Sequence, residues 1–215
     1  TGTLGLYDPL EGKYRWQRKY ESGPKAWPIS PQEVAVCDEQ GRLEVVALPG
    51  GRVLCSAQLD SPSQLRDLIV HKAFGQYVVI VNHRSSAVMS AIGHAMPIEG
   101  MAYGIDAASG RLRWSAELSQ CGFRPGGPTD IPLLVFELSA LVRRGASYQQ
   151  LTKLMCIDKR TGELLVDRDS TGRTGLLHQV NSDPEGRRIE IVGQNETFRF
   201  HFTDEPEHPQ QRSSK

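Results

Sequence analysis

The sequence has no excess of charge of either sign. Its 25 Lys and Arg residues balance 25 Asp and Glu residues, and its isoelectric point is near 7.0. Proteins that bind nucleic acid or anionic lipid electrostatically carry a strongly basic surface. The composition therefore disfavours both kinds of partner, and we expect no nucleic-acid partner.

The sequence also has no long apolar run. The longest candidates, 77–81 and 131–142, are shorter than the roughly 18–20 residues that a membrane-spanning helix needs. We therefore expect no membrane-spanning segment. The chain begins at Thr1 without a Met and already inside a repeat, which favours a piece of a longer protein.

Cysteines are few and widely spaced. None of the four is adjacent to another, and no C-x-x-C pair occurs (Cys37, Cys55, Cys121 and Cys156). An even number permits disulfides in an oxidising compartment. Cys37, Cys55 and Cys156 nevertheless lie among apolar strand residues, which favours buried free thiols that act as small hydrophobic groups.

The sequence does contain a repeated turn motif, here called a corner. In three places an Asp precedes a Gly by four positions, as Asp106 precedes Gly110, and the others are Asp8 with Gly12 and Asp158 with Gly162. The Asp side chain can accept backbone N–H groups one or two residues on, and the Gly can adopt the positive φ that closes a short hairpin. A fourth, degenerate copy has Ala47 and Gly51. Alternating apolar residues flank each corner, so the pattern predicts repeated β-hairpins.

The repeats lie 39, 59 and 52 residues apart, and the shortest spacing matches a four-stranded propeller blade of about 40 to 50 residues. We predict an all-β fold, a β-propeller of four-stranded antiparallel blades that forms a partial ring of about four blades. The propeller covers residues 1–202 with a truncated first blade, and residues 203–215 form a disordered tail. Four segments are predicted as loops: 21–32, 84–100, 119–130 and 141–149.

The segment Tyr103–Trp114 resembles the repeat of the pyrroloquinoline-quinone-like (PQQ-like) β-propellers, whose blades carry apolar-x-apolar-Asp-x-x-Thr/Ser-Gly-x-x-x-Trp. Asp106, Ser109, Gly110 and Trp114 fill that pattern. The first copy ends in Trp16, whereas Cys55 and Val166 occupy the Trp position in two others. The resemblance implies that each Trp packs on the turn of the neighbouring blade, and that Cys55 and Val166 mark looser or terminal junctions.

The family includes quinone-dependent dehydrogenases and non-enzymatic scaffolds. The dehydrogenases hold the quinone and Ca²⁺ with a Glu/Asn/Asp set, and some use an adjacent Cys-Cys pair. This chain has no adjacent cysteines and no ligand set that aligns. We therefore expect no cofactor, with PQQ and Ca²⁺ only under the alternative of a dehydrogenase that oxidises alcohols or sugars. Family resemblance alone implies a bacterial protein in a periplasmic or other extracytoplasmic location.

Candidate site residues are few. His71, His83 and His94 are 12 and 11 residues apart, which is too far for zinc ligands at hairpin spacing and favours surface or loop roles. His83 and Arg84 follow a predicted strand and could face a central channel, so they are the candidate ligand-binding residues. Asp106 and Asp158 are assigned to turns and not to acid–base catalysis.

The function predicted from sequence is a non-catalytic repeat domain that binds protein or a small ligand through its inter-strand loops. The proposed recognition loops are 84–100 and 119–130. No catalytic, cofactor-binding or metal-binding residue is assigned. A third alternative is a carbohydrate-binding, lectin-like propeller that uses its Trp residues.

Overall fold

The structure is a computed structural model of the 215-residue chain. It describes residues 2–21, 23–60, 65–83, 96–123, 131–144, 147–171, 179–183, 185, 187–192 and 197–202, and these form sixteen strands and no helix. The first eight strands are β1 (Gly2–Asp8), β2 (Lys13–Tyr20), β3 (Lys25–Ser30), β4 (Glu33–Cys37), β5 (Arg42–Ala47), β6 (Val53–Gln58), β7 (Asp67–Ala73) and β8 (Gln76–Asn82). The other eight are β9 (Met96–Asp106), β10 (Leu112–Phe123), β11 (Leu133–Arg144), β12 (Ser147–Asp158), β13 (Leu164–Thr171), β14 (Gln179–Asp183), β15 (Arg188–Val192) and β16 (Thr197–His201).

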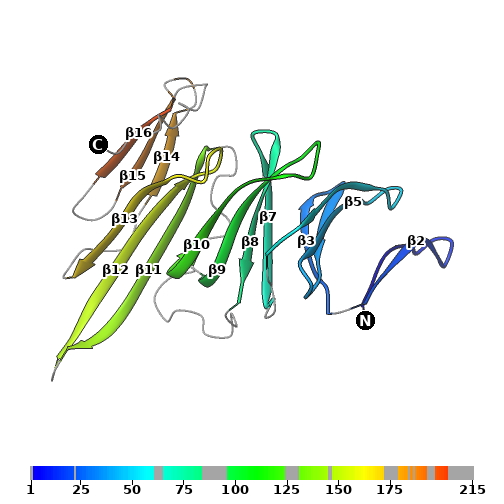
Figure 1. The fold of residues 1–215 in the computed structure, drawn as a ribbon, viewed down its shortest axis with the longest axis horizontal. Helices are drawn as coiled ribbons and strands as arrows, with labels where there is room; N and C mark the ends of the chain where they lie inside the picture. Colours follow the sequence, from blue (N-terminus) through cyan, green and yellow to red (C-terminus); the bar gives the residue numbers. More distant parts are fainter. Residues whose placement is uncertain are drawn as a thin grey trace, which may run out of the picture.

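The strands form antiparallel sheets in chain order. Strands β1–β2 form a two-stranded sheet, β3–β6 a four-stranded one, β7–β13 a seven-stranded one and β14–β16 a three-stranded one. Within the seven-stranded sheet, Phe123 and Phe136 are the one partner pair between β10 and β11 among the described residues. Few ladder hydrogen bonds therefore join β7–β10 to β11–β13 there. The prediction of an all-β protein with several antiparallel sheets is confirmed. The four-stranded blade count and the ring remain predictions, and Figure 1 shows β2 and β16 at opposite ends of a row of sheets.

Apolar cores lie between consecutive sheets and also between the two parts of the seven-stranded sheet, β7–β10 and β11–β13. In β8, Tyr77 and Val79 belong to a cluster shared with β4–β6, whereas Val78 and Ile80 belong to one shared with β11 and β12. A third cluster joins Cys156 of β12 to Ile191 of β15. Successive strand residues point to opposite faces, so a sheet with a neighbour on both sides must be apolar throughout. All seven residues of β8 are buried for this reason.

The four predicted corners are present as hairpin turns. In each, the N–H of the Gly donates to the carbonyl of the residue four positions earlier, over 2.8–2.9 Å. In the turn at Asp106, the N–H groups of Ala108 and Ser109 donate to the Asp106 carboxylate, and Arg113 pairs with its other oxygen. Hydrogen bonds from Ser109 and from Arg113 lower the pKa of Asp106 to about 2. The turn assignment of these Asp residues is confirmed.

The Trp residues connect neighbouring sheets. The indole Nε1 of Trp16 in β2 donates to the carbonyl of Leu48, 2.6 Å away in the β5–β6 turn. The indole of Trp114 in β10 donates to the carbonyl of Lys159 over 2.9 Å, in the β12–β13 turn. The implied packing of each Trp on the next turn is therefore present in both copies.

The sequence predicted a looser junction at Cys55 than at the Trp positions, and this prediction is wrong. A Cβ added at Gly110 would clash with the carbonyl oxygen of Ser56, and the Sγ of Cys55 lies 3.9 Å from the carbonyl oxygen of Asp106. The reason is steric: a side chain smaller than Trp lets the next turn approach the β6 backbone directly. All four cysteines are free and buried, as predicted for Cys37, Cys55 and Cys156.

The loop predicted over 21–32 is wrong, because β3 occupies residues 25–30. The prolines of this segment favoured a loop, yet Pro28 is accommodated because β3 is an edge strand of its sheet. Trp27 and Ile29 are half-buried, whereas Pro28 between them and Ser30 after them are exposed. This alternation was the strand signal that the prolines obscured.

The other predicted loops are partly strands. Residues 96–100 belong to β9, 119–123 to β10, and most of 141–149 to the paired arms of β11 and β12. Backbone pairing continues through the polar segment 141–149 because ladder hydrogen bonds do not require apolar side chains. In the other two segments Ile98, Cys121 and Phe123 are buried in an apolar cluster. Residues 84–95, 124–130 and 203–215 lie outside the described residues, so the predicted insertions and tail are not tested there.

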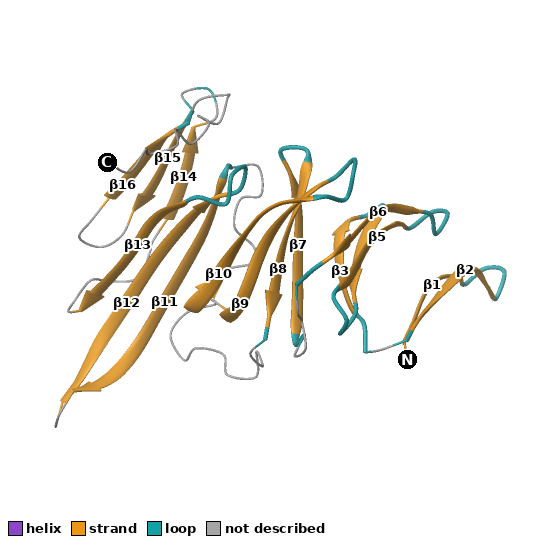
Figure 2. Cartoon of the chain, viewed as in Figure 1, coloured by secondary structure: helices purple, strands orange, loops and turns teal. Residues whose placement is uncertain are grey.

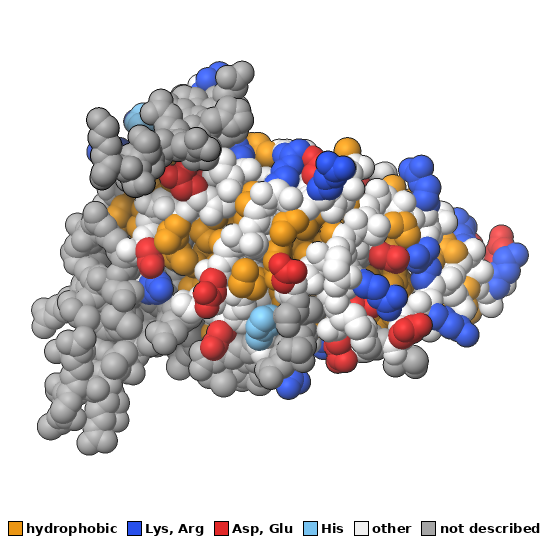
Figure 3. Space-filling view, in the orientation of Figure 1, with side chains coloured by type: hydrophobic (Ala, Val, Ile, Leu, Met, Phe, Trp, Pro, Cys, Tyr) orange, Lys and Arg blue, Asp and Glu red, His pale blue; other side chains and the backbone are white. Residues whose placement is uncertain are grey.

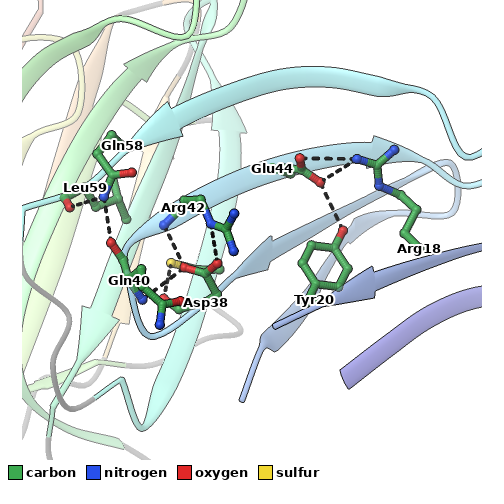
Figure 4. Close-up of polar contacts among 9 residues, drawn as sticks. Arg18, Tyr20, Asp38, Gln40, Arg42, Glu44, Gln58 and Leu59 are labelled. Atoms are coloured by element: carbon green, nitrogen blue, oxygen red, sulfur yellow. Dashed lines mark hydrogen bonds and ion pairs between the residues drawn. The ribbon is translucent and has the colours of Figure 1, made fainter. Parts of the chain in front are cut away.

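Polar contacts also join the first two sheets. Arg18 and Tyr20 of β2 both donate to the carboxylate of Glu44 in β5, and the Arg18–Glu44 ion pair measures 3.0 Å (Figure 4). The same view shows Arg42 donating to Asp38 within the β4–β5 turn.

Across the described part of the chain, no helix has the length and apolar character needed to cross a bilayer.

Candidate functional site

A pocket of about 290 Å³ lies where β3 meets β7. Its lining residues are Ile29, Ser30, Glu33, His71 and Lys72. β3 and β7 are each the edge strand of a sheet, and the two strands pack against each other. Because an edge strand has no hydrogen-bonded neighbour on its outer side, side chains and unpaired backbone groups can line a hollow there.

An ion pair forms one wall of the pocket. The Nζ of Lys72 lies 2.7 Å from Oε1 of Glu33 and 5.4 Å from the centroid of the Tyr77 ring. The hydrogen bond to Glu33 raises the pKa of Lys72, so its ammonium group stays charged. The other carboxylate oxygen of Glu33, Oε2, is buried and has no hydrogen-bond partner among the described residues. A buried carboxylate oxygen without a partner is costly to the folded state.

His71 also lines the pocket. It is half-buried in β7, with its ring centroid 5.8 Å from that of Phe123. Its Nε2 is also buried and unpartnered within the described part of the structure. Burial lowers the pKa of His71 to about 4, and repulsion from the Lys159 ammonium contributes. The imidazole is therefore neutral at physiological pH, and Nε2 either donates or accepts according to its tautomer.

The low pKa of His71 predicts a loss of stability in mild acid. A histidine whose folded pKa lies below its ordinary value of 6.5 binds a proton more readily when unfolded, so stability is full above pH 6.5 and falls as the pH drops towards 4. Between pH 7 and pH 5 we expect a loss of about 1 to 2 kcal/mol from this residue. Urea unfolding at a series of pH values measures it. His71→Gln is expected to flatten the profile in this window, and an unchanged profile would contradict the assignment.

The structure separates the histidines that the sequence grouped. His71 lies in a strand, which corrects the prediction of a surface or loop role. His83 follows β8, and its N–H donates to the carbonyl of Glu99 over 2.8 Å. Val78 is the partner of His71 in the β7–β8 ladder, so His83, five residues further along β8, lies towards the other end of the hairpin. Arg84 and His94 lie outside the described residues, so the proposed ligand-binding pair His83 and Arg84 is not tested.

Sequence patterns did not identify the pocket. Glu33 and Lys72 are 39 residues apart and belong to no motif. Glu33 is the first residue of β4, and it comes close to Lys72 of β7 where β3, which was predicted as a loop, packs against β7. The signal that was available is the Trp27–Ile29 alternation, which would have indicated an edge strand in front of Glu33.

The described residues contain no group of three or more His, Cys, Asp or Glu side chains that could hold a metal ion. Asp106 and Asp158 are engaged by their own turns, through bonds to Ser109 and Arg160. These contacts agree with the turn role assigned to both residues. The alternative of a quinone and Ca²⁺ site stays a prediction that the structure does not test.

Comparison with known proteins gives no family. No protein-family model matches this chain. No curated protein matches it either. Among solved structures, the chain is similar to the computationally designed Ika4 protein, with 13% identity, a TM-score of 0.43, and coverage of 86% of this chain and 94% of that one.

Two natural proteins are also similar in structure. BamB from Moraxella catarrhalis matches with 14% identity and a TM-score of 0.33, over 93% of this chain and 80% of that one. Sqt1 from Saccharomyces cerevisiae matches with 14% identity and a TM-score of 0.46, over 93% of this chain and 53% of that one. The chain thus spans about half the length of Sqt1. These likenesses are distant, and the function proposed below is based on the geometry of this chain.

Proposed function

We propose that this chain is a non-catalytic scaffold domain of the β-propeller type, and that it binds a protein partner through its turn edge. The turn edge consists of the hairpin turns β1–β2, β5–β6, β7–β8, β9–β10 and β12–β13. Figure 2 shows these turns in teal along the upper border of the row of sheets. The N–H of Ala107 donates to the carbonyl of Gly75 over 3.0 Å, which ties two of the turns directly together.

Phe74 is the observation that carries the proposal. It lies at the first position of the two-residue β7–β8 turn with φ 52°, in the left-handed region, and it is 45% exposed. Turns of this type favour Asn, Asp or Gly at that position, and a bulky L-residue there costs about 1–2 kcal/mol. Residues held in such conformations cluster at binding sites. An exposed aromatic ring at an unfavourable backbone position supports a binding role, because stability alone would favour a different residue.

Other apolar side chains are exposed along the same edge. Leu10, Leu112 and Leu164 each lie in or beside a turn, and Leu10 is 96% exposed. Figure 3 shows hydrophobic side chains interspersed with charges of both signs over one face of the row. Protein interfaces combine aromatic and apolar anchors with a polar rim. The composition of the turn edge is consistent with that pattern.

The turns present these side chains on a fixed framework. The Asp8 carboxylate accepts from the N–H groups of Leu10 and Glu11 and pairs with Arg15 at 2.6 Å. Such turns lose little conformational entropy when a partner binds, because they are already ordered. This rigidity supports recognition by a preformed surface.

Phe74→Asn is expected to separate binding from stability. The variant should be about 1 kcal/mol more stable in urea unfolding, because Asn tolerates the left-handed conformation. Its affinity for the partner should fall about tenfold or more, as for loss of an aromatic anchor. The partner is found by placing a photo-crosslinking amino acid at position 74 in the full-length protein in its source cell, and binding is then measured with both proteins purified.

The control carries the crosslinker at position 19, where the Lys19 side chain is exposed on β2 away from the turn. A protein adduct specific to position 74, whose purified partner binds Phe74→Asn weakly, supports the proposal. An adduct pattern identical at both positions, or equal affinity of wild type and variant, would overturn it.

A further inference from the structure

The outer face of the first sheet carries an exposed pair of tyrosines. In β1 and β2, one set of alternating side chains, which includes Trp16, faces the second sheet, and the other set is exposed. Tyr7 and Tyr14 lie opposite each other in the exposed set, and they are 51% and 53% exposed. Their ring centroids are 5.2 Å apart and their planes meet at 69°. The two rings therefore form an L-shaped aromatic notch, here called the tyrosine notch.

These tyrosines depart from the repeat pattern. The residue pairs at the same register beside the other three corners are aliphatic, namely Val46 with Val53, Ile105 with Leu112, and Ile157 with Leu164. In each pair the first residue is buried, with at most 1% of its surface exposed. Tyrosine tolerates water in the free state, and it offers a large apolar area at a low cost in conformational entropy. It therefore suits a face that a partner covers.

Polar side chains continue this face along the hairpin. Next to the notch, Gly5 is opposite Gln17, and beyond them Thr3 is opposite Lys19. A Cβ added at Gly5 would lie 3.1 Å from both the Tyr14 ring and the Gln17 side chain, so these two side chains lie over the glycine. The face is thus a strip that begins with two aromatic rings and ends with an ammonium group.

The first sheet is basic. Residues 2–20 contain four basic side chains and two acidic ones, although the whole chain is neutral. Three of the four basic side chains form ion pairs, with Glu11, Asp8 and Glu44. The fourth, Lys19, is exposed, and its ammonium group has no ion pair or hydrogen bond among the described residues. The charge of this face therefore favours an acidic partner over a basic one.

The chain contains an acidic proline segment of its own. Residues 204–209, with the sequence Asp-Glu-Pro-Glu-His-Pro, carry three carboxylates and no Lys or Arg. Pro206 and Pro209 are three positions apart, and a polyproline II helix has three residues per turn, so this spacing places both rings on one side, about 9 Å apart. Aromatic-lined grooves recognise P-x-x-P segments in this conformation, which loses little entropy on binding. The segment therefore matches both the rings and the charge of the strip.

The segment cannot reach the tyrosine notch of its own chain. β16 and the notch lie at opposite ends of the row (Figure 1), which has five layers because the seven-stranded sheet contributes two. Packed sheets are about 10 Å apart, so the four intervals span roughly 40 Å. From His201, where β16 ends, a fully extended chain reaches at most about 29 Å at Pro209. A second copy of the chain must therefore supply the segment.

We propose that the proline segment 204–209 of one copy binds the tyrosine notch of a second copy and joins the copies head to tail. One proline ring packs between Tyr7 and Tyr14, and a carboxylate of the segment pairs with Lys19. A head-to-tail contact closes into a ring or extends as an open chain. Phe74 lies two layers away in β7–β8, so this inference does not depend on the partner proposed for the turn edge.

The first test is an NMR titration with a synthetic peptide of residues 203–211. The ¹⁵N-labelled chain carries Pro206→Ala and Pro209→Ala, so its own segment does not compete. Saturable shifts at the notch and at Lys19 are expected. A peptide with the same two substitutions keeps its charge and is expected to bind about tenfold more weakly or less. No saturation at millimolar peptide, or equal binding of the two peptides, would overturn the proposal.

The repeat itself supplies a matched variant of the notch. Tyr7→Ile combined with Tyr14→Leu reproduces the Ile105–Leu112 pair, so the hairpin is expected to fold with an unchanged urea midpoint. Peptide binding is expected to fall about tenfold or more, because the rings are lost. If this variant does not fold, Lys19→Glu changes one exposed charge and is expected to weaken binding severalfold. Binding as tight as that of wild type in a folded variant would contradict the assignment.

Association of the whole chain is the second measurement. Sedimentation equilibrium is expected to show an average mass that rises with concentration, and Pro206→Ala with Pro209→Ala is expected to abolish this rise. Phe74→Asn is expected to associate as wild type does. A chain that stays monomeric at about 1 mM would sink the proposal, and so would loss of association in Phe74→Asn. A crosslinker at position 19 is expected to capture a second copy, whereas position 74 captures the turn-edge partner, so failure of one proposal is distinguishable from failure of the other.

Discussion

Replacing Trp114 with Ala is expected to lower the free energy of unfolding by about 3 to 5 kcal/mol, the usual cost of removing a large buried aromatic side chain. Trp114 is 8% exposed, and Cβ atoms added at Gly104 and Gly162 would clash with its indole, so glycine backbone packs on both sides of it. The variant also leaves the carbonyl of Lys159 without its indole donor. Urea unfolding followed by circular dichroism measures the change.

Two controls separate the causes. Trp114→Phe keeps much of the ring but removes the indole N–H, so we expect a smaller loss of about 1 to 2 kcal/mol. Trp16→Ala removes the equivalent contact to Leu48, but β1 and β2 form a sheet of two strands. Its effect should therefore be confined to the first hairpin and should appear as faster amide exchange there. A Trp114→Ala variant as stable as wild type would show that the sheets do not depend on this contact.

Gly110→Ala is expected to destabilise the fold strongly, by about 3 kcal/mol or more. Two costs add: a residue with a side chain must adopt φ 72°, and its Cβ must displace the carbonyl of Ser56, which is backbone and cannot rotate away. The junction between β6 and the β9–β10 turn would have to open. Thermal and urea unfolding measure the loss.

Gly12→Ala is the matched control. Gly12 holds the same position of the repeated turn with φ 67°, but the nearest atom to an added Cβ is the hydroxyl of Tyr7 at 4.0 Å. The variant therefore incurs the conformational cost alone, about 1 kcal/mol. The difference between the two variants isolates the contribution of close packing between sheets. Equal losses in both would contradict the assigned role of the Ser56 contact.

The repeated turns could be predicted from sequence because their information is local. An Asp followed four positions later by a Gly specifies both the side-chain acceptor and the left-handed backbone, and the structure has both at Asp106 and Gly110. The strand β3 could not be predicted with the rule that prolines mark loops. Whether Pro28 is tolerated depends on its place at the edge of a sheet, which is a tertiary property.

The pocket could not be predicted for a related reason. Glu33 and His71 come from different sheets, and their neighbourhood is created by the packing of β3 against β7. The neutral state of His71 depends on burial and on Lys159, which is 88 positions later in the sequence. No spacing rule within one segment contains that information. The exposed Phe74 could not be singled out from sequence either, because only its observed backbone angle distinguishes it from an ordinary surface residue.

The buried thiols give each junction its own chemical reporter. Cys37 and Cys55 belong to the first apolar cluster, Cys121 to the second and Cys156 to the third. Burial raises the pKa of Cys37, Cys121 and Cys156 to about 12, so these side chains are protonated and shielded from alkylating reagents in the native state. A cysteine becomes reactive when its own junction opens. The order in which the four cysteines are alkylated in dilute denaturant therefore records the order in which the junctions between the sheets open.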